Sequence, residues 1–170
     1  MRTVFSMRYL ALALMLIPCL PLNAIALEPV TGKVVLTISG KVEAKNSDKG
    51  AEFDLDMLEK LPQQTFTTMT PWSKKPIKFT GPLLRDVLNA ARAGGTILNA
   101  SALNDFQTRI PVGDARKFDV IIAHHMNGEI ISVKTKGPLF IVYPFDSKVE
   151  LRSVIYFERS VWQLRSLAVE

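Results

Sequence analysis

Residues 81–93 (GPLLRDVLNAARA) give the strongest helix prediction in a sequence whose other regular segments favour strands. Apolar residues recur there at helical spacing and form one stripe: Leu83, Leu84, Val87, Leu88 and Ala91. Proline suits the first turn of a helix, so we expect Pro82 there, and we expect Gly94 and Gly95 to end the helix. Because an amphipathic helix has to bury its apolar stripe, we expect this one to pack on the surrounding strands.

Short segments with alternating or β-branched residues account for most of the remaining regular structure. We predict strands at 31–44, 64–70, 77–80, 96–100, 106–111, 120–125, 130–133, 139–143 and 162–169. Two short helices are expected, at 54–61 with Asp54 as the cap and at 112–117. Asn127-Gly128 is the favoured pair for a tight hairpin turn. The predicted fold class is α+β, with mixed β-sheets, one main helix and short helices.

The first 26 residues have the composition of a signal peptide. A basic start is followed by an apolar run and by the small-x-small sequence Ala24-Ile25-Ala26. An uncleaved membrane anchor is the alternative, but the apolar run is short and is broken by two prolines. We therefore expect a signal peptide at 1–26, a single domain at 27–170, a periplasmic or secreted protein, and no membrane span after cleavage.

Cys19 is the only cysteine in the sequence, and it lies inside the predicted signal peptide. Lipidation of Cys19 is disfavoured because Pro18 stands where a lipoprotein signal needs a small residue. The mature chain would have no disulfide, no thiolate nucleophile and no thiolate bond to a metal. The basic residues are scattered and do not form one stripe, so we expect no nucleic-acid partner.

Several segments occur in an order that resembles the oxidoreductase molybdopterin-binding domain of sulfite oxidase and its bacterial periplasmic relatives. In chain order they are LTISGKV, FDLDMLEKLP, TTMTPW, FTGPLLRDVLNAARAGG, ALNDFQTRIP, VIIAHHMNGEII, KGPLFIVYP and VWQLRSLAVE. The resemblance covers about residues 31–169 and implies a sulfite oxidase-like fold. In that family, a cysteine thiolate at the end of the strand before the Trp-containing loop ligates molybdenum. Here that place falls at Thr68-Met69-Thr70, so we expect no cofactor, with molybdopterin as the alternative.

The Trp-containing loop and the ALNDF segment supply the candidate ligand-binding residues. Trp72 could wall a cleft or simply pack at its rim. Lys74 and Lys75, with Lys78, could hold an anion or form a solvated face. Asn104 and Asp105 could contact a ligand or only form an Asx turn.

Two further residues complete the candidate set. Arg109 follows Asp105 by four positions, so the two could pair on one face of a strand. Tyr143 could point its hydroxyl into the cleft or be a core tyrosine whose hydroxyl is satisfied.

His124 and His125 are the only histidines and would be attractive metal ligands. Adjacent residues on a strand point to opposite faces, and no third ligand at a suitable spacing is evident, so we assign no metal site. No nucleophile–base–acid set and no phosphate-binding glycine loop is present. We therefore assign no catalytic residue. Because the mature chain has no cysteine to ligate molybdenum, we also expect that the protein is not an enzyme.

The leading hypothesis is an exported, non-catalytic relative of the molybdopterin domain. It would bind an unidentified small molecule or a periplasmic protein partner in a sensing or accessory role. One alternative is a component of a molybdopterin-dependent oxidoreductase. Another is a protein-interaction module with a vestigial cleft.

Overall fold

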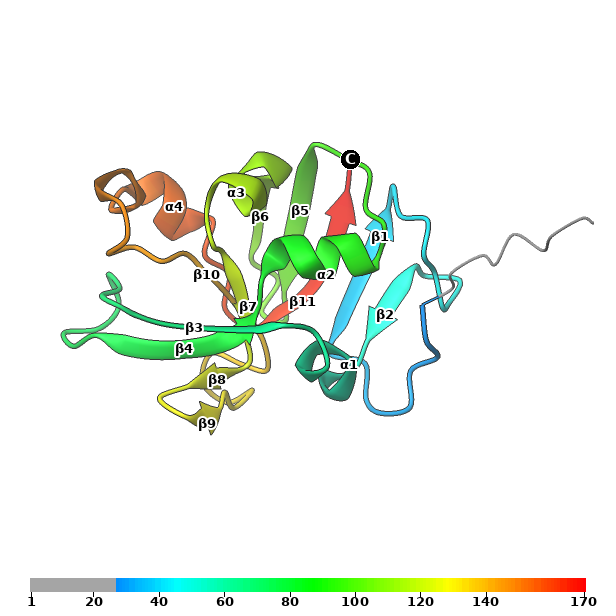
Figure 1. The fold of residues 1–170 in the computed structure, drawn as a ribbon, viewed down its shortest axis with the longest axis horizontal. Helices are drawn as coiled ribbons and strands as arrows, with labels where there is room; N and C mark the ends of the chain where they lie inside the picture. The colour runs from blue at the N-terminus through cyan, green and yellow to red at the C-terminus, as the bar shows by residue number, and fades with distance from the viewer. Residues whose placement is uncertain (1–26) are drawn as a thin grey trace, which may run out of the picture.

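The computed structural model describes residues 27–170, and the predicted signal peptide with Cys19 lies outside them. The α+β fold class is confirmed: several sheets are combined with a few short helices (Figure 1). No helix within the described range has the length and apolar character needed to cross a membrane.

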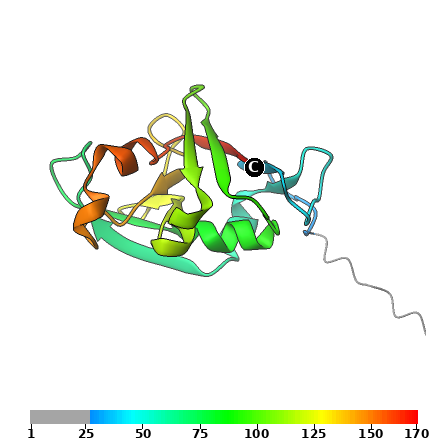
Figure 2. The same ribbon diagram turned by 90° about the horizontal axis from the view of Figure 1, so that it is seen from above.

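A five-stranded sheet forms one side of the molecule, in the order β2-β1-β11-β5-β6. Strand β1 pairs in parallel with β11, and the other neighbours are antiparallel. Helix α2 lies against one face of this sheet in both views (Figures 1 and 2), and its buried residues belong to the same core as those of the strands. The strands are β1 (Leu36–Gly40), β2 (Ala51–Phe53), β5 (Ile97–Ala102), β6 (Gln107–Pro111) and β11 (Leu164–Val169).

Helix α2 (Leu84–Ala90) buries the predicted apolar stripe but begins later than expected. Pro82 is not in its first turn, because Gly81 and Pro82 belong to strand β4 (Ile77–Pro82), where Pro82 pairs with Gln63. A Cβ at Gly81 would clash with the carbonyl oxygen of Ile122, so this crossing requires glycine. The helix also ends before Gly94, through Arg92 in the left-handed region at φ 49°.

The second sheet is antiparallel, in the order β3-β4-β8-β9. It contains β3 (Gln63–Thr68), β4, β8 (His125–Met126) and β9 (Glu129–Ile130). The predicted Asn127-Gly128 turn joins β8 to β9, with both residues at positive φ. The β3–β4 hairpin runs along one edge of the molecule towards the end that carries α4 (Figure 1). A separate pair, β7 (Ile121–Ala123) with β10 (Phe140–Val142), is completely buried.

Three short helices and a 3₁₀ turn complete the fold. They are α1 (Leu55–Glu59), α3 (Val112–Lys117), α4 (Val154–Glu158) and the turn η1 (Val149–Leu151). The sequence predicted α1 and α3 but not α4. The β-branched and aromatic residues of α4 have low helix propensity, so local pattern gives no signal for it. Its aromatic residues pack on the core, which supplies the missing stabilisation.

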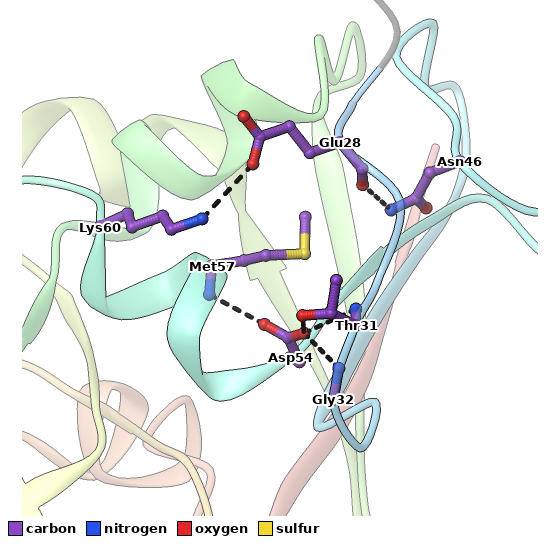
Figure 3. Close-up of polar contacts among 7 residues, drawn as sticks. All are labelled: Glu28, Thr31, Gly32, Asn46, Asp54, Met57 and Lys60. Carbon is purple, nitrogen blue, oxygen red and sulfur yellow. Dashed lines mark hydrogen bonds and ion pairs between the residues drawn. The ribbon is translucent and has the colours of Figure 1, made fainter.

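The Asp54 side chain joins α1 to the start of the described chain (Figure 3). One oxygen caps the helix by accepting the Met57 N–H at 2.9 Å, as predicted, and the other accepts the N–H groups of Thr31 (3.1 Å) and Gly32 (2.8 Å). The Met57 and Gly32 N–H groups lower the pKa of Asp54, while burial opposes them. The ionised carboxylate therefore holds this corner of the fold together.

Asp54→Asn should destabilise the protein by about 1 to 3 kcal/mol at neutral pH, because an amide has one acceptor oxygen where the carboxylate has two charged ones. The pKa of Asp54 is lower in the folded state. The extra stability of the wild type is therefore complete above the unfolded pKa near 3.8, and it is lost as the pH falls from there through the lower pKa of the folded state. Urea melts from pH 7 to 2 measure the difference. The matched control is Asp56→Asn, an exposed carboxylate in the same helical turn; an equal effect of both variants would contradict this account.

Candidate functional site

The loop after β3 is the place where the resemblance puts a metal-ligating cysteine. Asp146 anchors this loop: its carboxylate accepts the Met69 N–H at 2.6 Å, and its own N–H donates to Thr68 Oγ1 at 3.0 Å. Arg152 donates to the other carboxylate oxygen at 2.8 Å. The Met69 N–H lowers the pKa of Asp146, with a further contribution from Arg152, so the carboxylate stays ionised.

The side chains of this loop do not fit a molybdenum ion held as in the family. Met69 offers a half-exposed thioether, and Thr70 Oγ1 is a buried neutral hydroxyl without a hydrogen-bond partner among residues 27–170. The Asp146 carboxylate is a hard ligand whose two oxygens are already engaged. The adjoining hollow measures about 170 Å³, below the roughly 300–1,000 Å³ usual for cofactor-sized ligands.

Trp72, in the same loop, packs into a cluster of aromatic rings. Its ring centroid lies 5.4 Å from that of Trp162, 5.9 Å from Phe140, 6.3 Å from Phe145 and 6.4 Å from Phe157. All four contacts are edge-on or tilted, and aromatic pairs prefer such arrangements to a face-to-face sandwich. Even so, 36% of Trp72 stays exposed, so the cluster leaves part of the indole open to solvent.

A pocket of about 250 Å³ opens beside this cluster. Three segments that are far apart in the sequence form it: the loop after β3, the β5–β6 turn, and the stretch from the end of α4 to the approach to β11. The lining residues are Trp72, Asn104, Phe106, Phe157, Glu158, Ser160 and Trp162. The pocket wall is thus mainly aromatic and includes one carboxylate, from Glu158, and one carboxamide, from Asn104.

The indole faces already hold one cation from the chain itself. The Lys136 ammonium lies 3.9 Å from the centroid of the Trp162 ring and 5.7 Å from that of Trp72. Burial lowers the pKa of Lys136. Aromatic faces attract cations electrostatically, and Lys136 makes this contact within the chain itself.

The structure brings two of the predicted site residues together and separates the others from them. Trp72 and Asn104 both line the pocket. Asn104 also forms the Asx turn, since its Oδ1 accepts the Phe106 N–H at 3.2 Å. Lys74 and Lys75 are exposed and do not line the pocket, which corresponds to the solvated-face interpretation.

The predicted pairing of Asp105 with Arg109 is wrong. Asp105 lies in the turn before β6 at φ 64°, so the face-sharing rule for strands does not apply to it. Its exposed carboxylate lies 3.7 Å from Arg165, and Arg109 is paired instead with Glu170 at 3.4 Å.

Tyr143 is a core residue and does not point into the pocket. Its hydroxyl donates to the buried Asp114 carboxylate at 2.8 Å, and Arg159 donates to the same oxygen at 2.8 Å. Burial, followed by the Asp114 charge, raises the pKa of Tyr143 far above its ordinary value. The phenol is therefore a neutral structural donor.

Sequence reasoning missed most of the pocket wall. Phe157 and Glu158 belong to α4, which was not predicted, and Phe106 and Trp162 were assigned only to strands. The one usable signal was the exposed Phe106 directly after the Asn104-Asp105 turn. The contacts with α4 are long-range and have no local signature.

Comparison with known proteins points to one family. A family model described as the oxidoreductase molybdopterin binding domain matches residues 28–149. The crystal structure of the sulfane dehydrogenase SoxCD from Paracoccus pantotrophus is similar, with a TM-score of 0.58 and 20% sequence identity. The match covers 79% of this chain but 37% of that one, so this chain spans well under half of its length, and the likeness concerns the fold. No curated protein sequence matches the chain.

Asp114→Ala should destabilise the protein by about 3–5 kcal/mol, because it leaves the Arg159 charge and the buried Tyr143 hydroxyl without their acceptor. Asp119→Ala is the matched control. Its carboxylate makes an Arg–Asp contact of the same 2.8 Å length with Arg85, but at the surface, so the loss should stay below about 1 kcal/mol. Guanidinium melts measure both, and similar losses would contradict the role given to Asp114.

Proposed function

The chain belongs to the oxidoreductase molybdopterin binding domain family, and from this premise we propose that it is a non-catalytic member that binds a small ligand beside Trp72. One observation carries the proposal. The stretch Thr68-Met69-Thr70 offers no thiolate where the family resemblance places one, and Asp146 is committed to holding the loop.

The pocket beside Trp72 supports a ligand with a cationic or polar end. Its wall is mainly aromatic, and Glu158 is the carboxylate at its border. Because Lys136 already lies over the Trp162 ring, a ligand ammonium group would contact the remaining aromatic wall and Glu158, and such contacts strengthen when water is excluded. The volume of about 250 Å³ suits a molecule smaller than a typical cofactor.

The proposed setting is outside the cytoplasm. If residues 1–26 are a cleaved signal peptide, the domain would meet its ligand in the periplasm or in the secreted fraction. A family fold that binds a small molecule without turning it over suits a sensing or accessory role.

A protein partner is the second candidate occupant of this region. Val154 and Ile155 on α4 are 66% and 56% exposed, and they lie in the helix that also supplies Phe157 to the pocket. Exposed apolar side chains grouped in this way are typical of interaction surfaces. A molybdopterin-dependent oxidoreductase component is the third candidate and rests on family membership alone.

We expect the purified protein to contain neither molybdenum nor pterin, even from cells that export it and make the cofactor in excess. The reason is that residues 68–70 provide only two hydroxyls and a thioether. Elemental analysis and the fluorescence of oxidised pterin measure both components. Stoichiometric molybdenum would contradict the non-catalytic proposal, and pterin without metal would favour the oxidoreductase alternative.

Small organic cations such as choline and benzylamine should raise the melting temperature, because a ligand that binds only the folded state stabilises it. The uncharged carbon isostere of choline should have a weaker effect. Trp72→Ala and Glu158→Gln should each remove the shift, while Lys74→Ala, outside the pocket, should keep it. Absence of any shift, together with a protein that co-purifies and is lost on Ile155→Asp substitution, would favour the protein-partner alternative.

A further inference from the structure

The two histidines and a glutamate converge beside Gln63, at the opposite end of β3 from the loop that carries Trp72. The two Nδ1 atoms of His124 and His125 lie 2.7 Å apart, and His124 Nδ1 lies 3.8 Å from Glu59 Oε1. The three candidate ligand atoms all lie within 4.8 Å of one another. They border an open hollow that is also lined by Gln63, Lys78, Thr80 and Gly128.

Both imidazoles reach the same side because the strand is interrupted between them. Strand β7 ends at Ala123 and β8 begins at His125. The His124 N–H donates to the Thr80 carbonyl at 3.0 Å, while His125 is the residue paired with Thr80. His124 and His125 thus both lie opposite Thr80, as two residues lie opposite one in a β-bulge. A bulge interrupts the alternation of side chains along a strand. The expectation that these histidines face opposite ways is therefore wrong.

Gln63 fixes the tautomer of His124. Its amide nitrogen donates to the carbonyls of Leu58 and Leu61, each at 2.8 Å, so its oxygen is the atom that faces His124 Nε2, also at 2.8 Å. His124 must then carry its proton on Nε2 and present a lone pair at Nδ1. A carbonyl that orients the far nitrogen of a ligating imidazole is the usual supporting contact in metal sites.

The Nδ1 lone pair of His124 thus lies 3.8 Å from a Glu59 carboxylate oxygen, which brings two metal-ligating atoms close together. The His125 Nδ1–H donates to this lone pair at 2.7 Å, so a cation that binds here has to take the place of that proton.

We propose that Glu59, His124 and His125 form a binding site for a divalent transition-metal ion of the zinc type. The ligand atoms are the two Nδ1 atoms and one carboxylate oxygen of Glu59. His125 moves its proton from Nδ1 to Nε2 on binding, which leaves the charge of the ring unchanged. Two imidazoles with one carboxylate are a donor set that zinc accepts, and the open hollow leaves room for water as a fourth ligand.

The three ligand atoms lie within 4.8 Å of one another, so no separation has to change by more than about 1.5 Å to suit zinc. Tetrahedral zinc with bonds of about 2.0–2.1 Å separates its ligand atoms by about 3.3 Å. The two Nδ1 atoms would move apart from 2.7 Å, and Glu59 would approach from 3.8 Å. His125 is half-buried and 42% of the Glu59 side chain is exposed, so both can move, while His124 is held by Gln63.

Titration of the tag-free chain with zinc chloride alone tests the site by calorimetry. We expect saturable one-to-one binding, weakened at least tenfold by His125→Gln and by Glu59→Gln. Glu129→Gln is the matched control, since this exposed carboxylate lies in β9, outside the cluster, and should leave the affinity unchanged. Absence of one-to-one binding overturns the proposal. So does a result in which only one of the two substitutions matters, or in which the control weakens binding equally.

A second measurement on the unsubstituted chain does not depend on any variant folding. The sequence has two histidines, so nitrogen NMR of the imidazoles yields two sets of signals. Zinc should shift the Nδ1 signals of both rings. The His124 Nε2 proton should stay on the ring, hydrogen-bonded to Gln63. Unchanged Nδ1 signals, or coordination through Nε2, overturns the proposal.

Discussion

The buried Asp114 carboxylate is the contact on which the pocket depends. Asp114 lies in α3, and its carboxylate accepts two hydrogen bonds. One comes from the hydroxyl of Tyr143, directly after β10, and the other from the guanidinium of Arg159, directly after α4. Helix α4 has no buried residue of its own, and its sequence favours helix only weakly. A buried charge has to keep its partners, so the position of Arg159 is strongly determined. That position in turn sets Phe157 and Glu158 at the pocket wall.

Hydrogen bonds organise the loop after β3 in this chain. The Asp146 carboxylate accepts the Met69 N–H, and the Thr68 hydroxyl accepts the Asp146 N–H. Hydrogen bonds in both directions therefore join the loop to the segment after β10. Arg152 completes the charge balance of Asp146. With the backbone fixed in this way, Trp72 can reach across to Trp162. The loop thus has a polar anchor at one end and an aromatic anchor at the other.

Local signals in the sequence were sufficient for the fold class, the capping of α1 by Asp54 and the Asn127-Gly128 hairpin. They failed where distant segments decide the outcome. Pro82 suits a helix start by itself, but pairing with Gln63 and the close approach of Gly81 to Ile122 place it in β4. The pocket was predicted only as far as Trp72 and Asn104, because Phe157 and Glu158 depend on α4, while Phe106 and Trp162 were assigned only to strands. The His124–His125 convergence was missed because alternation holds only along an unbroken strand.

Strand β3 shows how these features are connected. Four of its six residues are exposed, so burial alone holds it weakly. Its two ends are fixed by side chains instead: Gln63 bridges the carbonyls of the α1 segment and His124, and Thr68 receives the Asp146 N–H. Polar contacts therefore position the β3–β4 hairpin at the same two places where the histidine cluster and the aromatic pocket begin. A ligand in the aromatic pocket, or a metal ion at the histidine cluster, would therefore bind beside the polar contacts that position β3.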